Sequence, residues 1–505
     1  MKILEKKAEQ FCHDILSLID INHTKAFVGI VMALGSEVHS SNPTNLSLSP
    51  FFQYHYSITS KVMKEIGIKL TSSENRSFKR GLYSLLKDHI PQEEVYKLNT
   101  DFTTIRKPHS PSLENRGYVN IPNNPIRSNK SIDVGYYASC VNIGFYNAAS
   151  DVPWNLPLDT QLVDLDADKM EFAAGQLRDI LTEKELPFGK APLVVNTADS
   201  GYGSPSYICP LIEQFNNLLL IIRLRHGIKV YRPYDGAQTD TGKDKAYADE
   251  PHYLQVGSTR KCYNPKTKEH FEKTVMSIFD LTPDEIKQYE TKTKKGRELI
   301  VELYRWNGLL LRGTREHKMS DKPFDLICVR FIEKETGRLI FNKDMYLSLW
   351  SKEPIDYDTK DAQIDYLRRF DIEGHNRFMK QQLLADKYQT PDVNHLSAWL
   401  WTVQTTFWLL FAARTDVQVQ VYPWEKYLES VKRAELSDKP LSIALTRKGA
   451  KTHFLTFDIT PFAPQKSKNG KGRKKGDTQT KRDKHKPRRK HITEQNKKQK
   501  IEKIE

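Results

Sequence analysis

Four side chains with complementary chemistry recur at helical spacing near the C-terminal third of the chain. They are Tyr366, Arg369, Glu373 and Lys380, separated by three, four and seven residues. At about 100° per residue these positions fall within an arc of about 60° on one face of a helix. One acid is thereby flanked by groups that bind phosphate. The alternative is an exposed face on which Arg369 and Glu373 form a simple i,i+4 ion pair, worth a few tenths of a kcal/mol.

Two aspartates occupy strand-like surroundings earlier in the chain. Asp199 ends the apolar run that begins at Pro192, and the chain then turns on Gly201 and Gly203. Sites in α/β sheets are built where a central strand ends, because side chains there face an open crevice. The alternative for Asp199 is a helix N-cap or a turn. Asp101 lies among apolar and Thr neighbours in the β-prone run 95–105, where an edge residue is the alternative reading.

Three carboxylates from distant points of the chain are chemically coherent as a metal site. Two divalent ions about 4 Å apart activate an attacking oxygen and stabilise a leaving one, and they require oxygen ligands. We therefore expect Asp101, Asp199 and Glu373 to be both catalytic and metal-binding, with two Mg²⁺ or Mn²⁺ ions and not a structural zinc.

The elements that must position these residues follow a mixed α/β order. Strands are expected at 95–105, 131–145 and 162–165, a helix at 167–181, a strand at 192–197, a helix at 206–216 and a strand at 217–225. Between 232 and 353 the pattern becomes β-type, with strands at 298–311, 324–333 and 339–349 and a short helix at 282–290 signalled by Thr-Pro-Asp-Glu. A long helix at 358–386 and an apolar core helix at 393–413 follow.

Charge is concentrated at one end of the chain. Residues 465–505 contain 17 Lys and Arg against five Asp and Glu, which accounts for +12 of the net charge of +15. This composition predicts a disordered basic tail that attracts phosphate. We expect the run 481–490 to bind nucleic acid through Lys481, Arg482, Arg488, Arg489 and Lys490. A solvated tail that aids solubility is the alternative.

The sequence gives no sign of secretion, of membrane insertion, of disulfide bonds or of a zinc site. The five cysteines, Cys12, Cys140, Cys209, Cys262 and Cys328, are scattered, which argues against a disulfide framework or a zinc knuckle. Charged residues interrupt any secretory signal after Met1. The run 396–413 is short and contains Gln404, so we expect a buried helix and not a membrane span. We expect a cytoplasmic protein, associated with the nucleoid when bound to DNA, without a small-molecule cofactor.

These residues resemble a known family, the bacterial insertion-sequence transposases of the DDE type marked by a Y-x2-R-x3-E-x6-K signature. Tyr366, Arg369, Glu373 and Lys380 match that signature at every position. Asp199 is similar to the second acid of the family and Asp101 to the first, with Asp133 as the alternative first acid. The separation of 174 residues between Asp199 and Glu373 leaves room for the β insertion of the family.

The resemblance implies a fold and a set of DNA contacts. The fold is α/β, an RNase H-like mixed sheet flanked by helices. The expected parts are an N-terminal helical domain (1–90), the catalytic core (91–231 and 354–464), a β-rich insertion (232–353) and the disordered basic tail (465–505). Apolar periodicity indicates the helices of 1–90, which we expect to bind DNA; a plain helical lid on the core is the alternative. Tyr366, Arg369 and Lys380 would grip phosphates. Trp306 would stack on a displaced base of the transposon end, since it offers a wide π face near basic groups; a core position is its alternative.

The implied function is DNA transposition by an endonuclease that cleaves inverted-repeat ends and joins the 3′-hydroxyl to target DNA. A homodimer is expected, because two ends must be paired. Three readings compete with it: a stand-alone RNase H-like nuclease, a catalytically inactive transposase-derived DNA-binding protein, and a structural basic protein.

Overall fold

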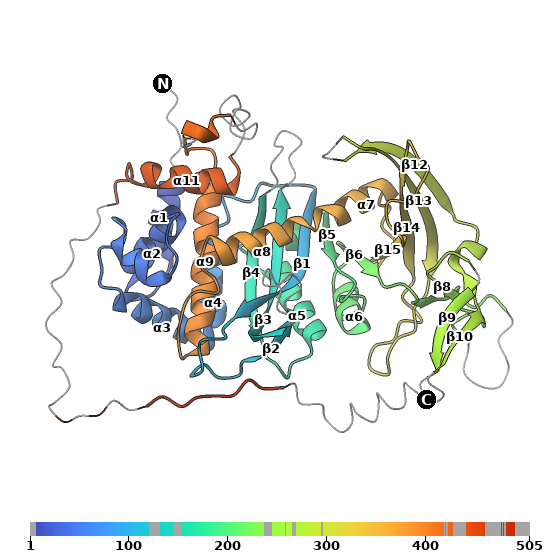
Figure 1. Cartoon of the computed structure of the whole chain (residues 1–505), viewed down its shortest axis with the longest axis horizontal. Coiled ribbons are helices and arrows are strands. Elements are labelled where there is room, and N and C mark those ends of the chain that lie inside the picture. Colours follow the sequence, from blue (N-terminus) through green and yellow to red (C-terminus); the bar gives the residue numbers. More distant parts are fainter. Residues whose placement is uncertain are drawn as a thin grey trace.

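A mixed sheet forms the centre of the molecule in the computed structural model of the chain (Figure 1). The structure describes residues 7–120, 132–145, 154–236, 245–257, 259–264, 269–293, 296–418, 420, 423–427, 441–459, 476, 478 and 481–489. Within these residues the sheet has ten strands: β1 (Val95–Arg106), β2 (Gly117–Asn120), β3 (Ile132–Phe145), β4 (Trp154–Val163), β5 (Leu193–Ala198), β6 (Leu218–Leu224), β12 (Glu285–Lys292), β13 (Glu298–Leu309), β14 (Phe324–Glu333) and β15 (Met345–Trp350).

Strand direction changes across the sheet. The order is β12, β13, β14, β15, β6, β5, β1, β3 and β2, and β4 also pairs with β3. β5 is parallel to β1 and β6 is parallel to β5, whereas β3 is antiparallel to β1 and β15 is antiparallel to β6. The carboxyl ends of β1, β5 and β6 therefore meet at one edge, where α/β sheets commonly place their sites.

Helices cover both faces of the central strands. They are α5 (Lys169–Thr182) and α6 (Pro205–Gln214) on one face, and α7 (Thr359–Arg368) and α8 (Asp371–Gln381) on the other (Figure 1). Val194 packs into the same apolar cluster as Tyr207 of α6, whereas the next residue, Val195, packs with Tyr366 of α7. Burial on both faces explains why β5 and β6 read as apolar runs without alternation.

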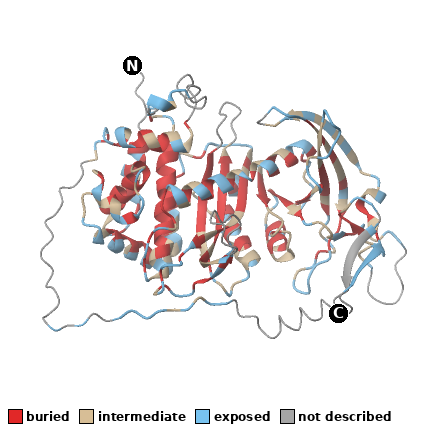
Figure 2. Ribbon diagram, in the orientation of Figure 1, coloured by how far each residue is buried: buried red, intermediate tan, exposed pale blue. Residues whose placement is uncertain are grey.

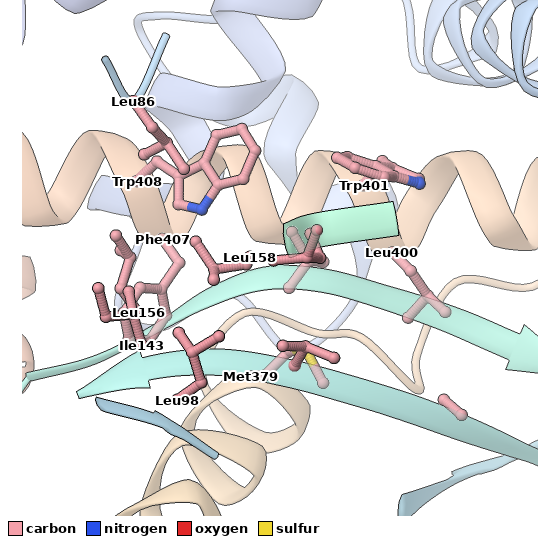
Figure 3. Close-up of a cluster of buried hydrophobic side chains, with 14 of the residues drawn as sticks. Leu86, Leu98, Ile143, Leu156, Leu158, Met379, Leu400, Trp401, Phe407 and Trp408 are labelled. Atoms are coloured by element: carbon pink, nitrogen blue, oxygen red, sulfur yellow. The ribbon is translucent and has the colours of Figure 1, made fainter. Parts of the chain in front are cut away.

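A helical layer lies beside the sheet. It contains α1 (Lys7–Leu18), α2 (Thr24–Ser36), α3 (Ser57–Thr71), α4 (Asn75–Ser84), α9 (Val393–Ala413) and α11 (Ile443–Phe454). Figure 2 shows α9 buried along most of its length, and Figure 3 shows Phe407 of α9 beside Leu156 of β4 and Trp408 of α9 near Leu158. Gln404 donates its side-chain amide to the carbonyl oxygen of Leu158 at 2.9 Å. This helix is therefore part of the core, and no helix among the described residues is long and apolar enough to cross a membrane.

Shorter strands form two small sheets. The short strands are β7 (Lys229–Val230), β8 (His252–Tyr253), β9 (Thr259–Asn264), β10 (Glu269–Thr274) and β11 (Met276–Ser277). One sheet joins β9 with β10, and the other joins β7 with β8 and β11. The 3₁₀ turns are η1 (Pro43–Leu48), η2 (Pro187–Lys190), η3 (Ile278–Asp280) and η4 (Pro423–Glu425).

The β-rich segment 232–353 contributes strands to the main sheet. Trp350 of β15 pairs with Leu220 of β6, so β12 to β15 widen the central sheet beyond β6. The prediction of a helix at 282–290 is wrong, because β12 occupies most of this segment and pairs with β13. Asp284, expected in the helix start, instead accepts the backbone N–H of Asn307 at 2.7 Å. A tertiary pairing has overridden a local capping signal.

Several expected boundaries also shift. The strand expected at 162–165 is the end of β4, which begins at Trp154, and the strand expected at 339–349 begins only at Met345. The single helix expected at 358–386 is two helices, α7 and α8, separated by a turn at Arg369 and Phe370. Helix 393–413 is confirmed as α9.

Candidate active site

Asp101 and Asp199 lie on neighbouring parallel strands at the carboxyl edge of β5. The last residue pair between β1 and β5 is Thr100 with Ala198. Asp101 directly follows Thr100, and Asp199 directly follows Ala198. On its other side, Asp101 is opposite Cys140 of β3. Pairing of β1 with β5 therefore brings together two acids that are far apart in the sequence.

Buried polar side chains hold these two strands in register. The Asn196 side-chain amide donates to Oγ1 of Thr100 at 2.8 Å and accepts the hydroxyl of Tyr207 at 2.8 Å. One residue on, the Thr197 hydroxyl donates to Oδ1 of Asn99 at 2.6 Å. Because all of these groups are buried, a slip in register would leave several of them without partners.

A tight turn orients Asp199. Its Oδ1 accepts the backbone N–H of Gly201 at 2.7 Å, and a Cβ at Gly201 would approach this oxygen to 3.0 Å. Tyr202 then stacks on Phe102 of β1, with ring centroids 5.5 Å apart and an interplanar angle of 14°. The turn is thus fastened to the strand that carries Asp101.

The carboxyl group of Asp101 is influenced by both of the other expected acids. Burial raises the pKa of Asp101, the Arg369 guanidinium lowers it and the charges of Asp199 and Glu373 raise it, which together bring this pKa to about 6. The backbone N–H of Phe102 donates to Oδ1 of Asp101 at 2.9 Å. Asp199, at the end of β5, and Glu373, in the first turn of α8, therefore both act on the buried carboxyl group of Asp101 in β1.

The alternative first acid lies elsewhere. Asp133, at the start of β3, accepts a hydrogen bond from Nε of Arg106 at 2.6 Å, and its other oxygen accepts the backbone N–H of Val134 at 2.7 Å. It is not among the charges that shift the pKa of Asp101. On position, Asp101 is the better partner for Asp199.

The four signature residues are divided by the turn between α7 and α8. Tyr366 belongs to α7, Arg369 to the turn, and Glu373 and Lys380 to the first and last turns of α8. The junction contains tighter i→i+3 hydrogen bonds, from Arg369 N–H to Tyr366 O at 3.2 Å and from Glu373 N–H to Phe370 O at 3.1 Å. The uniform 60° arc expected from a single helix therefore does not apply across the turn.

Arg369 packs against two aromatic rings at this turn, which contains neither proline nor glycine. Its guanidinium carbon lies 5.5 Å from the ring centroid of Tyr366 and 4.8 Å from that of Phe370. Arg369 is only 6% exposed, and its Nε has no hydrogen-bond partner among the described residues. A buried cation with an unused donor next to carboxylates is suited to an anionic ligand.

Tyr366 and Lys380 differ in their access to a ligand. Tyr366 is fully buried, and burial raises the pKa of its hydroxyl while Arg369 and Arg223 lower it. Burial lowers the pKa of Lys380, which the charge of Asp101 raises. Lys380 thus lies within electrostatic reach of Asp101, whereas Tyr366 is a packing partner of Arg369.

Arg223 is a basic residue of this site that sequence reasoning missed. β6 pairs Ile222 with Ala198 of β5, so Arg223 follows one row beyond, level with Asp199. The charge of Arg223 lowers the pKa of the Tyr366 hydroxyl. The available signal was a lone cation near the end of an otherwise apolar strand, Leu218 to Leu224.

The donor set suits a hard divalent cation, but the ligands do not converge. Among the described residues, no three His, Cys, Asp or Glu side chains lie close enough together to hold a metal ion. Asp101 and Asp199 each use one carboxylate oxygen for a backbone N–H. Carboxylate chemistry and mutual repulsion at Asp101 fit Mg²⁺ or Mn²⁺.

Trp306 does not fit the base-stacking role. It is 2% exposed, and its indole N–H donates to the carbonyl oxygen of Leu281 at 3.0 Å. Phe279 and Tyr304 pack against its ring. Because its ring is packed and its indole N–H has a partner, Trp306 is a core residue, which was the alternative to base stacking.

Part of the expected disordered tail is docked on the body of the protein. Residues 481–489 run as an extended trace below β2 (Figure 1), where Arg488 forms a β-bridge with Gly117. The Arg488 guanidinium donates to Oδ2 of Asp166 at 2.6 Å and to Oδ1 of Asn115 at 2.9 Å. Lys481, Arg482 and Arg489 are exposed, and Lys490 lies outside the described residues. Arg488 therefore has protein partners in place of phosphate.

Among solved structures, the chain is similar to the piggyBac transposase in a cryo-EM synaptic complex with hairpin DNA. The TM-score is 0.33 with 8% sequence identity, over 89% of this chain and 70% of that chain. No family model matches the chain. No curated protein matches it either. A likeness with this TM-score assigns neither fold nor function, so the candidate site stands on its own geometry.

Proposed function

We propose that the chain is a DNA transposase of the DDE type, with Asp101, Asp199 and Glu373 as its metal-binding acids. The placement of Asp101 and Asp199 on adjacent parallel strands carries the proposal, and the charges of Asp199 and Glu373 both raise the pKa of the buried Asp101. Mutually repelling acids in a folded site are stabilised when a cation binds among them. Arg369, which lowers the pKa of Asp101, supplies only part of that positive charge.

The topology supports an RNase H-like core. Three strands, a helix, a strand, a helix and a strand follow one another from β1, β3 and β4 through α5, β5 and α6 to β6. Antiparallel pairing of β3 with β1 and parallel pairing of β5 and β6 agree with that order. On this proposal, 91–231 and 354–464 form the catalytic core, and the strands of 232–353 are an insertion that extends its sheet.

Each residue then has a defined task in phosphodiester chemistry. Bound Mg²⁺ or Mn²⁺ would activate the attacking oxygen and stabilise the leaving one. Asp101 and Asp199 would bind from adjacent strands with their remaining carboxylate oxygens, and Glu373 would join them from α8. Arg369, Lys380 and Arg223 would hold phosphate oxygens, and Tyr366 would keep the Arg369 guanidinium in place.

The proposed substrate is the end of a DNA element with inverted repeats. Attack by water would release a 3′-hydroxyl, and attack of that hydroxyl on target DNA would complete strand transfer. Since two ends must react together, we propose that a homodimer forms the synaptic complex. The helical region 1–90 is the proposed reader of the ends, with the basic tail adding affinity for phosphate.

The test is Mg²⁺-dependent cleavage of DNA carrying the sequences that flank the gene. Asp199→Asn and Glu373→Gln keep side-chain size and remove one charge each. Asp133→Asn makes the same change in an acid outside the cluster and is the matched control. We expect Asp199→Asn and Glu373→Gln to lose at least about 100-fold in rate, while the control stays within about threefold of the natural chain.

Other outcomes assign a different function. Cleavage of any DNA without preference for the flanking ends would indicate an RNase H-like nuclease. Binding without cleavage by the natural chain, with several divalent metals, would indicate an inactive transposase-derived DNA-binding protein. Equal losses in Asp133→Asn and Asp199→Asn would contradict the assignment of the acids.

A further inference from the structure

The loop between β13 and β14 bears a cluster of cations over a pair of tyrosines. Three of the four Lys and Arg residues of this loop, Arg312, Arg315 and Lys318, are exposed, and Lys322 is half-buried. The three exposed residues make no ion pair in the described part of the chain, unlike nearby Lys322, which contacts Glu213 at 3.0 Å. The loop borders a hollow of about 580 Å³, lined by Arg312, Lys318 and residues 245–249 among others.

Arg312 is held in a defined orientation. Its guanidinium carbon lies 4.9 Å from the ring centroid of Tyr231 and 5.9 Å from that of Tyr247. The two rings contact each other at 5.4 Å, and the Tyr247 hydroxyl donates to the carbonyl oxygen of Leu311 at 3.2 Å. Stacking occupies the flat side of a guanidinium and leaves its in-plane N–H donors available.

The loop itself is tightly folded. Thr314 and His317 close a turn through two hydrogen bonds, from Thr314 N–H to His317 O at 2.9 Å and from His317 N–H to Oγ1 of Thr314 at 3.1 Å. A Cβ at Gly313 would come within 2.2 Å of the His317 carbonyl oxygen, so this approach requires glycine. The cations are therefore presented by a folded loop, which lowers the entropy lost on binding.

The loop rests on the helix that follows the Asp199 turn. The Cys209 thiol of α6 lies 3.5 Å from the Lys318 carbonyl oxygen, and Met319 beside it is buried. The acid lining the hollow, Asp249, already pairs with Lys245 at 3.1 Å. The positive charge of Arg312 and Lys318 thus faces this hollow, and the loop that carries them contacts α6, the helix that follows the Asp199 turn.

We propose that Arg312, with Lys318 beside it, binds the phosphate backbone of DNA that extends from the active site. This inference deepens the proposed function, on which it rests for the identity of the ligand. A guanidinium stacked on aromatic rings donates two parallel hydrogen bonds to a phosphate, which a lysine ammonium in its place does not reproduce. Backbone binding of this kind is independent of base sequence.

The experiment compares two arginine-to-lysine changes in the same loop. Arg312→Lys keeps the charge and removes the stacked planar donor, whereas Arg315→Lys makes the same change at an exposed arginine for which no ring contact is described. Affinity is measured by fluorescence anisotropy with a labelled DNA duplex of mixed sequence. We expect Arg312→Lys to weaken binding about tenfold and Arg315→Lys to change it less than about twofold.

A second variant keeps the test independent of folding. Arg312→Gln should reduce the slope of log affinity against log salt concentration by about 0.9, since one phosphate contact is lost, with an unchanged thermal midpoint. Unchanged affinity in Arg312→Lys, or an unchanged salt slope in Arg312→Gln, would overturn the proposal. Cleavage by the natural chain is measured separately. Cleavage with no role for Arg312 would leave the transposase proposal standing and overturn phosphate binding by Arg312. An affinity that depends on Arg312 without cleavage would support phosphate binding by Arg312 and contradict the transposase proposal.

Discussion

Asp101 and Asp199 stand next to each other because the β1–β5 pairing ends at Thr100 and Ala198, one residue before each acid. The two side chains therefore share the carboxyl edge of a parallel strand pair, and α8 brings Glu373 within electrostatic reach. This relationship depends on the buried hydrogen bonds that fix the register of the two strands.

The Asn196 network should matter for both stability and activity. Asn196→Ala would leave Thr100 and Tyr207 without their buried partner, at a cost of about 2–3 kcal/mol in the free energy of unfolding. Tyr207→Phe removes only one hydroxyl and should cost about 1 kcal/mol. Urea unfolding measures both. Wild-type stability in Asn196→Ala would show that the network does not hold the strands.

Trp306 should act as a core residue. Trp306→Ala should lower the free energy of unfolding by about 3–5 kcal/mol, because it empties a site packed by Phe279 and Tyr304. Trp306→Phe should cost less, since most of the apolar volume remains. Denaturant unfolding gives these values. If Trp306→Ala is fully stable but no longer quenches a base analogue such as 2-aminopurine at the DNA end, the stacking role returns.

Docking of the tail should protect it from protease. Asp166→Asn removes the carboxylate that binds Arg488, so trypsin should cut after Arg488 and Arg489 several times faster than in the natural chain. Glu171→Gln, an equal change at an exposed acid of α5, is the control. Mass spectrometry of timed digests identifies these cuts. Equal rates in all three proteins would mean that the ion pair does not hold this segment.

Histidine burial predicts a loss of stability in mild acid. Burial, reinforced by Arg414, lowers the pKa of His89 from 6.5 to about 4, and its ring packs edge-on against Phe11. Between these values the unfolded chain binds a proton that the folded chain does not. The contribution of His89 to the free energy of unfolding is therefore complete above pH 6.5. It is lost as the pH falls towards 4, at roughly 1 kcal/mol per pH unit or less.

The matching variant is His89→Phe, which keeps a ring and removes the titration. Unfolding by urea between pH 7 and pH 4 should show a smaller decline in this variant than in the natural chain. Parallel declines in the two proteins would assign the acid sensitivity to other groups.

The sequence by itself determined the local elements and the chemistry they carry. Apolar runs covered on both faces marked β5, β6 and α9, because strong local patterns persist in any packed fold. Residue type and spacing also led to Asp101, Asp199 and Glu373 as candidate acids, an assignment that stays a prediction.

Only the tertiary structure decided which groups meet. Pairing with β13 turned an apparent helix start into β12. Burial removed Trp306 from the surface, and Asp166 bound a tail that composition alone marked as disordered. These outcomes depend on contacts between residues far apart in the chain, whose energies local periodicity and composition do not contain.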